Sequence, residues 1–278
     1  MLVPTTIRPR AMFACLALMA AFVLAPSMAA ARDQAAVTLT VPTYGDGSHR
    51  YYHELLRQSM ESIGYRPVLR ILAPHLPQRR AVSMMERGEL SLIWLLRTHE
   101  RDSRFTRIDQ PLTKGLISMR ILFIPRGSQS VYNHVTSLGD FRKLGLMAGF
   151  GKGWYDARVW EANDLPFIER DGEWRVLYRQ VAMSDRGVDY MPRGANEIVL
   201  EARQHPDLVV ERNLILSYDR DFHFYLSDSG KKYAGVLEAA LEKALSTGLM
   251  DALLQEFFGE VPEILNFSRR RHLELKTP

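Results

Sequence analysis

Apolar positions alternate between two spacings along the first third of the chain. The apolar, β-branched residues 37–41 predict a strand. From Tyr52 to Ile63 apolar residues recur every three or four positions, which predicts a helix with Ser48 as its N-cap and Gly64 as its end. A strand at 67–72, a helix at 77–87 and a strand at 90–95 follow. This order predicts an α/β fold with a mostly parallel sheet.

A second α/β unit is expected after a strand at residues 117–125. Ser137 and Asp140 have the spacing of a helix capping box, and the apolar run at 144–148 predicts a strand. The glycine-rich stretch 149–153 then leads into an expected helix. The remaining expectations are helices at 154–162 and 195–204, strands near 174–178, 188–192 and 208–216, and two amphipathic helices at 236–245 and 250–258.

The N-terminal pattern is of a different kind. Arg8 and Arg10 precede an apolar run at 11–24, and small residues follow at 29–31. This order is typical of a secretory signal peptide. A membrane anchor is the alternative, but the run is shorter than the ~20 residues that a spanning helix needs. We therefore expect residues 1–31 to be a signal peptide and the mature protein to be periplasmic.

Composition narrows the possible chemistry. The one cysteine, Cys15, lies in the expected signal peptide, so the mature chain has no thiol for a disulfide, a metal site or a nucleophile. The formal charge of the whole chain is +4, of which the signal peptide carries two arginines, and this balance argues against a nucleic-acid partner. The basic cluster 269–272 is expected to be a solvated terminus. No metal-ligand spacing is present, and no metal or cofactor is expected.

The glycine-rich stretch raises the question of phosphate binding. A P-loop requires Ser or Thr after the lysine, but Lys152 is followed by Gly153, and G-x-G-x-G is not the dinucleotide-binding pattern. What remains is a turn that exposes backbone N–H groups at a helix N-terminus beside Lys152. Two interpretations stay open, an anion site and a glycine turn that binds nothing.

Four segments in a fixed order resemble one protein family. They are AVSMMERGELSLIW (81–94), RTHERDSRFTRIDQPL (97–112), SLGDFRKLGLMAGFGKGW (137–154) and RGVDYMPRG (186–194). In this order they resemble the type II periplasmic solute-binding proteins of the amino-acid class, family 3, across essentially the whole mature chain. The resemblance implies two α/β lobes, each a mostly parallel sheet flanked by helices, joined by two hinge strands with the ligand between them.

The resemblance also implies lobe boundaries. Lobe 1 would comprise residues 32–122 and, as C-terminal helices and a tail, 223–278. Lobe 2 would comprise residues 123–222. The hinge strands are expected near 121–125 and 218–222.

In lobe 1 the resemblance implies a carboxylate-binding arginine. Thr98 and Arg101 match a Thr-x-x-Arg motif whose arginine holds a ligand carboxylate in bidentate fashion, with Arg97 as a rival. Tyr44 and Trp94 occupy places suited to an aromatic contact with the ligand. For Tyr44 a surface position is the alternative, and for Trp94 the lobe core.

In lobe 2 the resemblance implies an anion site and an altered acid site. Gly151, Lys152 and Trp154 would present a helix N-terminus to an anionic group of the ligand. Arg193 stands where the family places an acid for the ligand's amine, with Glu197 one helical turn later. Arginine cannot accept a hydrogen bond from an ammonium group. These features together favour an anionic ligand.

The function implied by the resemblance is non-enzymatic. An exported, monomeric protein would capture a small anionic or amino-acid-like solute for an ABC permease or a membrane sensor. The alternative is a periplasmic enzyme on the same fold, similar to cyclohexadienyl dehydratases acting on prephenate or arogenate. Glu100, His99 and Asp189 are its candidate acid–base residues. No nucleophile, metal or acid–base constellation is recognisable, which favours the binding protein.

Overall fold

The computed structural model describes residues 1–2, 36–73, 75–184 and 186–278. The expected signal peptide, apart from its first two residues, and Cys15 lie outside these ranges. Within the described ranges no helix has the length and apolar character needed to cross a membrane. All elements named below belong to one compact unit, residues 34–278.

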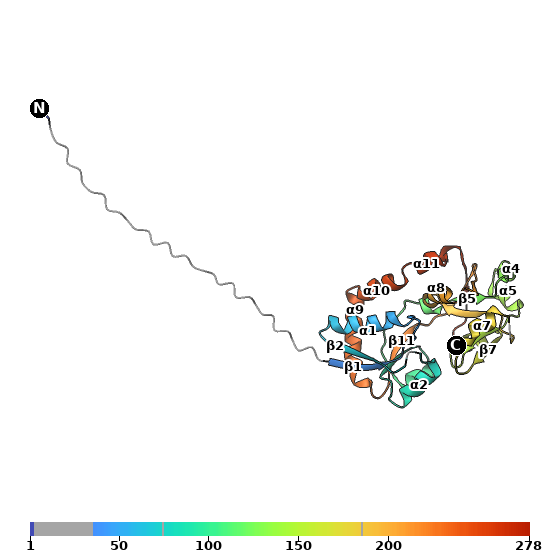
Figure 1. The fold of residues 1–278 in the computed structure, drawn as a ribbon, viewed down its shortest axis with the longest axis horizontal. Coiled ribbons are helices and arrows are strands. Elements are labelled where there is room, and N and C mark those ends of the chain that lie inside the picture. The colour runs from blue at the N-terminus through green and yellow to red at the C-terminus, as the bar shows by residue number, and fades with distance from the viewer. Residues whose placement is uncertain (3–35, 74, 185) are drawn as a thin grey trace. The chain divides into compact units, whose positions relative to one another are not determined.

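The first lobe is built around strands β1 (Ala36–Val41; Figure 1) and β3 (Leu92–Leu96). β1 pairs in parallel with β2 (Arg66–Ile71), and β11 (Phe222–Leu226) pairs antiparallel with β3 and β4 (Thr106–Arg107). Backbone and side chain of Ser91 both bond to Thr40, which ties the two sheets together. The helices of this lobe are α1 (Arg50–Ser62), α2 (Gln78–Glu86), α3 (His99–Arg104), α9 (Ala234–Ser246) and α10 (Leu249–Phe258), with short 3-10 turns η1 (Leu116–Ser118) and η2 (Lys231–Tyr233).

The second lobe has β5 (Met119–Ile124) at its centre. β5 pairs antiparallel with β8 (Met191–Gly194), β9 (Val209–Val210) and β10 (Leu214–Ser217). β10 pairs in parallel with β12 (Arg271–Glu274), and β6 (Ala148–Gly151) with β7 (Phe167–Arg170). The helices are α4 (Gln129–Tyr132), α5 (Leu138–Lys143), α6 (Asp156–Ala162), α7 (Val176–Ala182), α8 (Ala195–Gln204) and α11 (Val261–Ile264), with the 3-10 turn η3 (Phe267–Arg269).

The two-lobed α/β fold is confirmed, but the sheets are mixed and not mostly parallel. β5 carries the chain into the second lobe, and β10 leads it back toward β11 in the first lobe. Because these two segments cross in opposite directions, they pair antiparallel with each other, and β11 pairs antiparallel with its neighbours. The antiparallel pairs therefore follow from the double crossing that joins the lobes.

The end of the chain lies in the second lobe, where the first lobe was expected for all of residues 223–278. α9 and α10 do pack on the first-lobe core, but Leu273 and Leu275 belong to the second-lobe core beside β10. Arg270 is buried and donates to the carbonyl oxygens of Leu265 and Leu214. Within the basic cluster 269–272, Arg270 is thus not solvated, whereas Arg269, Arg271 and His272 are exposed as expected.

Several local predictions also need correction. Ser48 does not cap α1; its hydroxyl donates to Asp46, and the N-cap position is His49. The segment expected as a strand near 174–178 begins helix α7, because its buried residues Leu177, Tyr178 and Val181 recur at helical spacing. Ser137 is confirmed as the N-cap of α5, since its Oγ accepts from the Asp140 N–H, but the box is not reciprocal, because the Asp140 carboxylate accepts from the Thr136 N–H.

Candidate functional site

The glycine-rich stretch is a strand followed by a turn. Gly149 and Gly151 lie in β6, which begins four residues and ends three residues later than the expected strand. A Cβ on Gly149 would come within 2.8 Å of the Leu177 and Val188 side chains, and one on Gly151 within 2.6 Å of the Trp154 indole. Both glycines are therefore explained by close packing.

The expected anion site is filled by a side chain of the protein. The Gly153 N–H donates to Glu169 at 2.9 Å, and Lys152 Nζ pairs with the same carboxylate at 2.6 Å. Helix α6 begins only at Asp156, whose own carboxylate lies in its first turn. Glu169 thus already occupies the Gly153 N–H and neutralises the charge of Lys152.

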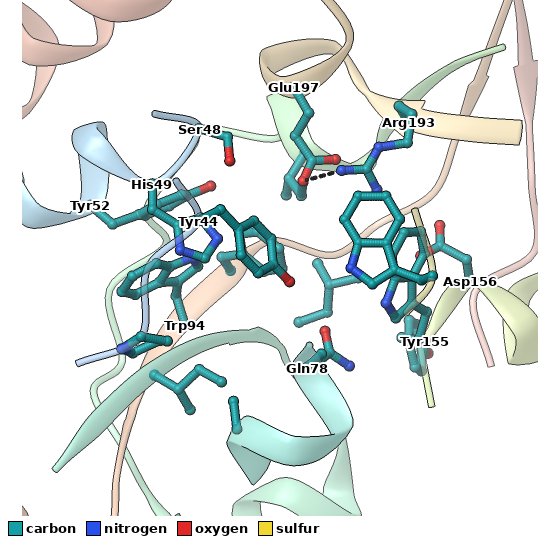
Figure 2. A pocket seen from close by; sticks show the side chains of 18 of the residues that line it. Tyr44, Ser48, His49, Tyr52, Gln78, Trp94, Tyr155, Asp156, Arg193 and Glu197 are labelled. Atoms are coloured by element: carbon teal, nitrogen blue, oxygen red, sulfur yellow. Dashed lines mark ion pairs between the residues drawn. The ribbon is translucent and has the colours of Figure 1, made fainter. Parts of the chain in front are cut away.

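A cavity of about 70 Å³ lies between the lobes. Since one water needs about 10–15 Å³ of such space, the cavity holds roughly five waters, on the scale of a small solute. Figure 2 shows rings from both lobes around it. The aromatic lining consists of Tyr44, His49, Tyr52, Trp94, Trp154, Tyr155, Trp174 and Phe222.

The structure brings together part of the predicted site. Five of the eight predicted residues line the cavity: Tyr44, Trp94, Arg101, Trp154 and Arg193. The other three, Thr98, Gly151 and Lys152, do not line it. Thr98 instead caps α3 by accepting from the Arg101 N–H at 3.1 Å, so it holds the helix that carries Arg101.

The first-lobe wall is a stack of neutral rings. Tyr52 stacks on Trp94 with ring centroids 4.7 Å apart, and His49 meets the edge of Trp94 and stacks on Tyr44. Burial lowers the pKa of His49 to about 3, and its Nδ1 is buried without a hydrogen-bond partner. Burial also raises the pKa of Tyr44 to about 12. At neutral pH these rings are uncharged.

Arg101 is the charged group of the first-lobe wall. Its guanidinium donates to the carbonyl oxygens of Leu96 at 2.5 Å and Gly153 at 3.4 Å. In the described part of the chain no ion pair joins it to an acidic residue. The rival, Arg97, is half-exposed, pairs with Asp102 and does not line the cavity. Arg101 is thus the arginine with an unneutralised charge at the cavity.

Two arginines of the second-lobe wall are bound to acids of the same lobe. Arg120 on β5 holds Asp156 through two contacts, Nε to Oδ1 at 2.7 Å and Nη2 to Oδ2 at 2.9 Å. The Tyr218 hydroxyl donates to the same carboxylate at 2.9 Å. Arg193 holds Glu201 through two bonds of 2.8 and 2.6 Å. All four charged side chains are buried.

Arg193 also carries an aromatic sandwich. Its guanidinium carbon lies 4.9 Å from the ring centroid of Trp154 and 4.9 Å from that of Trp174. Cation–π contacts of this kind are strongest where water is excluded. The guanidinium is therefore a fixed part of the wall.

Glu197 is the carboxylate left over in the second-lobe wall. One oxygen lies 3.0 Å from Arg193, and the other accepts from the Gly194 N–H and lies 3.6 Å from Arg120 (Figure 2). Each of these arginines is already bound by another acid in two-contact geometry. Burial raises the pKa of Glu197. The wall thus contributes one surplus negative charge opposite Arg101.

The expected cationic cleft is therefore corrected. Lys152 is paired with Glu169 away from the cavity, and Arg193 is neutralised by Glu201. What faces the cavity is one surplus cation on the first lobe and one surplus carboxylate on the second. This arrangement complements a zwitterion better than an anion.

Some of these residues had a signal in the sequence. Glu197 and Glu201 are four residues apart, which places them on one side of α8, while Arg193 lies in β8, four residues before Glu197. An arginine four residues before a glutamate indicates an ion pair. Arg120 is a lone charge in the apolar run of β5, the usual sign of a buried partner. Its pairing with Asp156 depends on tertiary contacts between distant segments, which local spacing does not encode.

The candidate acid–base residues of the enzyme alternative lie elsewhere. Glu100 is exposed and pairs with Arg104 and Arg158, and Asp189 accepts from the Met147 N–H. Neither these two nor His99 lines the cavity. Across the described residues no group of three or more His, Cys, Asp or Glu has the arrangement of a metal site.

No protein-family model and no curated protein matches the sequence. Solved structures do match, at low sequence identity. A mutant of ArgBP from T. maritima aligns with TM-score 0.59 and 13% identity, over 80% of this chain and 96% of that chain. An amino-acid ABC transporter substrate-binding protein from Streptococcus pneumoniae, bound to L-arginine, aligns with TM-score 0.58 and 16% identity, over 81% and 95%.

A third match concerns the enzyme alternative. An ancestral amino-acid-binding protein, described as a precursor of cyclohexadienyl dehydratase, aligns with TM-score 0.58 and 13% identity, over 80% of this chain and 95% of that chain. These matches cover nearly the whole of each solved chain. They show that this chain has the two-lobed fold of amino-acid-binding proteins.

Proposed function

We propose that this chain is an exported solute-binding protein that holds an amino-acid-like zwitterion between its lobes. The observation that carries the proposal is the pair of surplus charges, Arg101 on one lobe and Glu197 on the other, facing one aromatic cavity. Arg101 binds the solute's carboxylate and Glu197 its ammonium group. Tyr44, Trp94 and Trp154 cover its apolar part.

Binding at two lobes gives a mechanism for signalling occupancy. A solute that contacts both surplus charges stabilises the closed arrangement more than an open one, which shifts the population toward closure. A membrane partner, either an ABC permease or a sensor, then recognises the closed protein. The matched structures that bind amino acids support this reading of the fold. We propose a periplasmic monomer, with residues 1–31 removed on export.

A ligand screen tests the proposal. Thermal unfolding of the mature protein is measured with the L-amino acids and, for each side chain, with the analogue lacking the ammonium group and the amine lacking the carboxylate. We expect one or more amino acids to stabilise the protein and both truncated analogues to do so less. A ligand at about 100 times its Kd adds about 2.7 kcal/mol to the free energy of unfolding.

Variants at the two charges sharpen the screen. Arg101→Ala is expected to weaken binding of the best amino acid by about tenfold to a hundredfold, since charged hydrogen bonds contribute about 1.5–3 kcal/mol. Arg97→Ala is the matched control and leaves affinity unchanged. Tighter binding of the analogue without an ammonium group would instead indicate an anionic solute. If no amino acid, organic acid, amine or sugar stabilises the protein, solute binding itself is refuted.

A dehydratase-like enzyme is the second candidate. The observation in its favour is Glu197, a cavity acid whose pKa is raised by burial, as a general acid requires. Prephenate and arogenate are incubated with the protein and their products quantified. We expect decay at the spontaneous rate. Product formation above that rate, lost in Glu197→Gln, would establish the enzyme.

A further inference from the structure

Residues 275–278 run along the second lobe beside the cavity wall. β12 ends at Glu274, and the Leu275 N–H continues the pairing by donating to the Ser217 carbonyl oxygen at 2.8 Å. The Asp219 N–H donates to the Thr277 hydroxyl at 3.0 Å. The 275–278 segment is thus fixed to the crossover that follows β10.

The same segment contacts α6 at its C-terminal end. Asn163, the C-cap of α6, is buried, and its amide makes two bonds to Lys276: it donates to the carbonyl oxygen and accepts from the N–H, both at 2.8 Å. The side-chain amide therefore pairs with the backbone as a strand neighbour would. Asn163 also donates to the Val159 carbonyl oxygen, so both N–H groups of its amide are used, one within α6 and one toward Lys276.

The segment contacts α6 again at its N-terminal end. Tyr155, the N-cap of α6, donates its hydroxyl proton to the Pro278 carbonyl oxygen at 2.5 Å. Arg220 donates to the same oxygen at 2.9 Å, and its guanidinium lies 5.5 Å from the Tyr155 ring centroid. Tyr155 lines the cavity, whereas Pro278 and Arg220, to which its hydroxyl and ring are held, do not.

The next residue, Asp156, also lines the cavity and is the acid that neutralises Arg120. Residues 275–278 therefore hold both ends of α6. The N-terminal end of α6 supplies two residues of the cavity wall. We infer that residues 275–278 position α6, and through it Tyr155 and Asp156, for the solute. That this positioning serves solute binding rests on the proposed function. The positioning of α6 by residues 275–278 can be tested without a solute.

The test uses the full chain and three variants. One variant ends at Leu275, which removes every contact to Lys276, Thr277 and Pro278. Tyr155→Phe removes only the hydroxyl contact. Lys276→Ala is the matched control, because Lys276 contributes backbone atoms alone to these bonds and its side chain is exposed. Each protein is labelled with 5-fluorotryptophan, and amide hydrogen exchange is measured in parallel.

We expect the shortened variant to shift or broaden the ¹⁹F signals of Trp154 and Trp160, which flank and lie within α6, and to leave that of Trp94 in the first lobe unchanged. Amides of α6 should exchange at least about tenfold faster, since local opening becomes easier. Tyr155→Phe should affect the Trp154 signal alone, and Lys276→Ala neither signal.

Two results would overturn the inference. One is a shortened variant, folded by circular dichroism, whose Trp154 signal and α6 exchange match the full chain. The other applies if shortening unfolds the protein: the inference is then overturned when Tyr155→Phe leaves the Trp154 signal unchanged. Because no solute is present, either result leaves the proposed function untouched, whereas a failed ligand screen leaves this measurement valid.

Discussion

At the scale of single residues, the charges of the cavity fall into two groups. Arg120 with Asp156 and Arg193 with Glu201 are buried pairs with two contacts each. Such pairs are costly to break singly, because the remaining charge is left in a low-dielectric surrounding. Arg101 and Glu197 are free of such exclusive partners. The first group maintains the wall, and the second is available to a solute.

This division predicts how Arg193 behaves when removed. Arg193→Ala leaves Glu201 buried without its partner, and we expect the free energy of unfolding to fall by about 3–5 kcal/mol. Urea unfolding followed by circular dichroism measures it. The control, Arg70→Ala, removes an exposed arginine and should change stability by less than about 0.5 kcal/mol. A loss in Arg193→Ala no larger than in the control would contradict the buried-pair description.

Glu197 predicts a pH dependence of solute binding. Burial raises its pKa, and the ammonium group of the proposed solute needs the ionised carboxylate. Affinity should therefore be constant above that raised pKa and fall below it, by up to about tenfold per pH unit. Calorimetric titration with the best amino acid across pH 4–8 measures this profile.

Two variants separate the contributions to the profile. In Glu197→Gln the affinity should be weak and nearly independent of pH, because the titrating group is gone. In Arg101→Gln it should be weak but keep the wild-type pH dependence. A wild-type profile that persists in Glu197→Gln would assign the titration to another group.

At the scale of elements, β6 shows how a sequence motif can mislead. Its alternating glycines look like a ligand loop, but they allow α7 and the Trp154 ring to approach the strand. The turn that follows is neutralised by Glu169. The first turn of α6 then supplies Tyr155 and Asp156 to the cavity. The element that contributes residues to the site is thus helix α6, which follows the glycines. The glycines themselves make room for α7 and the Trp154 ring.

This explanation of β6 can be tested with alanine. Gly149→Ala places a methyl group against Leu177 and Val188, and we expect a loss of about 1–3 kcal/mol in the free energy of unfolding from overpacking. Gly235→Ala on α9 is the control, because its Cβ meets nothing within 4 Å; it should stabilise by about 0.5–1 kcal/mol. Equal effects in thermal unfolding would refute the packing account.

At the scale of the whole molecule, contacts between the lobes hold the cavity closed. Arg175 pairs with Asp46 at 2.5 Å on one side, and Arg158 pairs with Glu100 at 2.7 Å on another. Gln78 donates to the Gly153 carbonyl oxygen at 3.0 Å. The Arg158–Glu100 pair is exposed, so it adds little stability and salt screens it. This pair alone therefore contributes little to closure, and we expect a solute that contacts both lobes to add to it.

Small-angle scattering tests this expectation. We expect the radius of gyration of the mature protein to decrease when the best amino acid is added, because the solute binds both lobes. In 1 M salt without solute the radius should be at its largest. An unchanged radius at saturating solute would count against closure around the ligand.

The fold could be predicted from the sequence further than the site. The spacing of apolar residues in the first third of the chain predicted its strands and helices correctly. The order of the four family-like segments predicted the two-lobed architecture. The tail strand β12 was missed because its pairing with β10 joins residues far apart in the chain. Of the five predicted residues that line the cavity, Trp94 and Arg193 lie within strands. Tyr44 and Trp154 follow strands, and Arg101 lies in the first turn of α3. The pairing of Lys152 with Glu169 could not be predicted, since tertiary packing brings these two residues together.

The separation of the two groups of charges has an evolutionary consequence. Substitutions at Arg101 or Glu197 change what the cavity accepts and leave both buried pairs intact. Substitutions at Arg120, Asp156, Arg193 or Glu201 unfold the wall before they alter selectivity. Proteins tolerate new functions when the altered residues lie outside the network that maintains the fold. New solute preferences on this scaffold should therefore arise first at positions 101 and 197, with the four paired residues held constant.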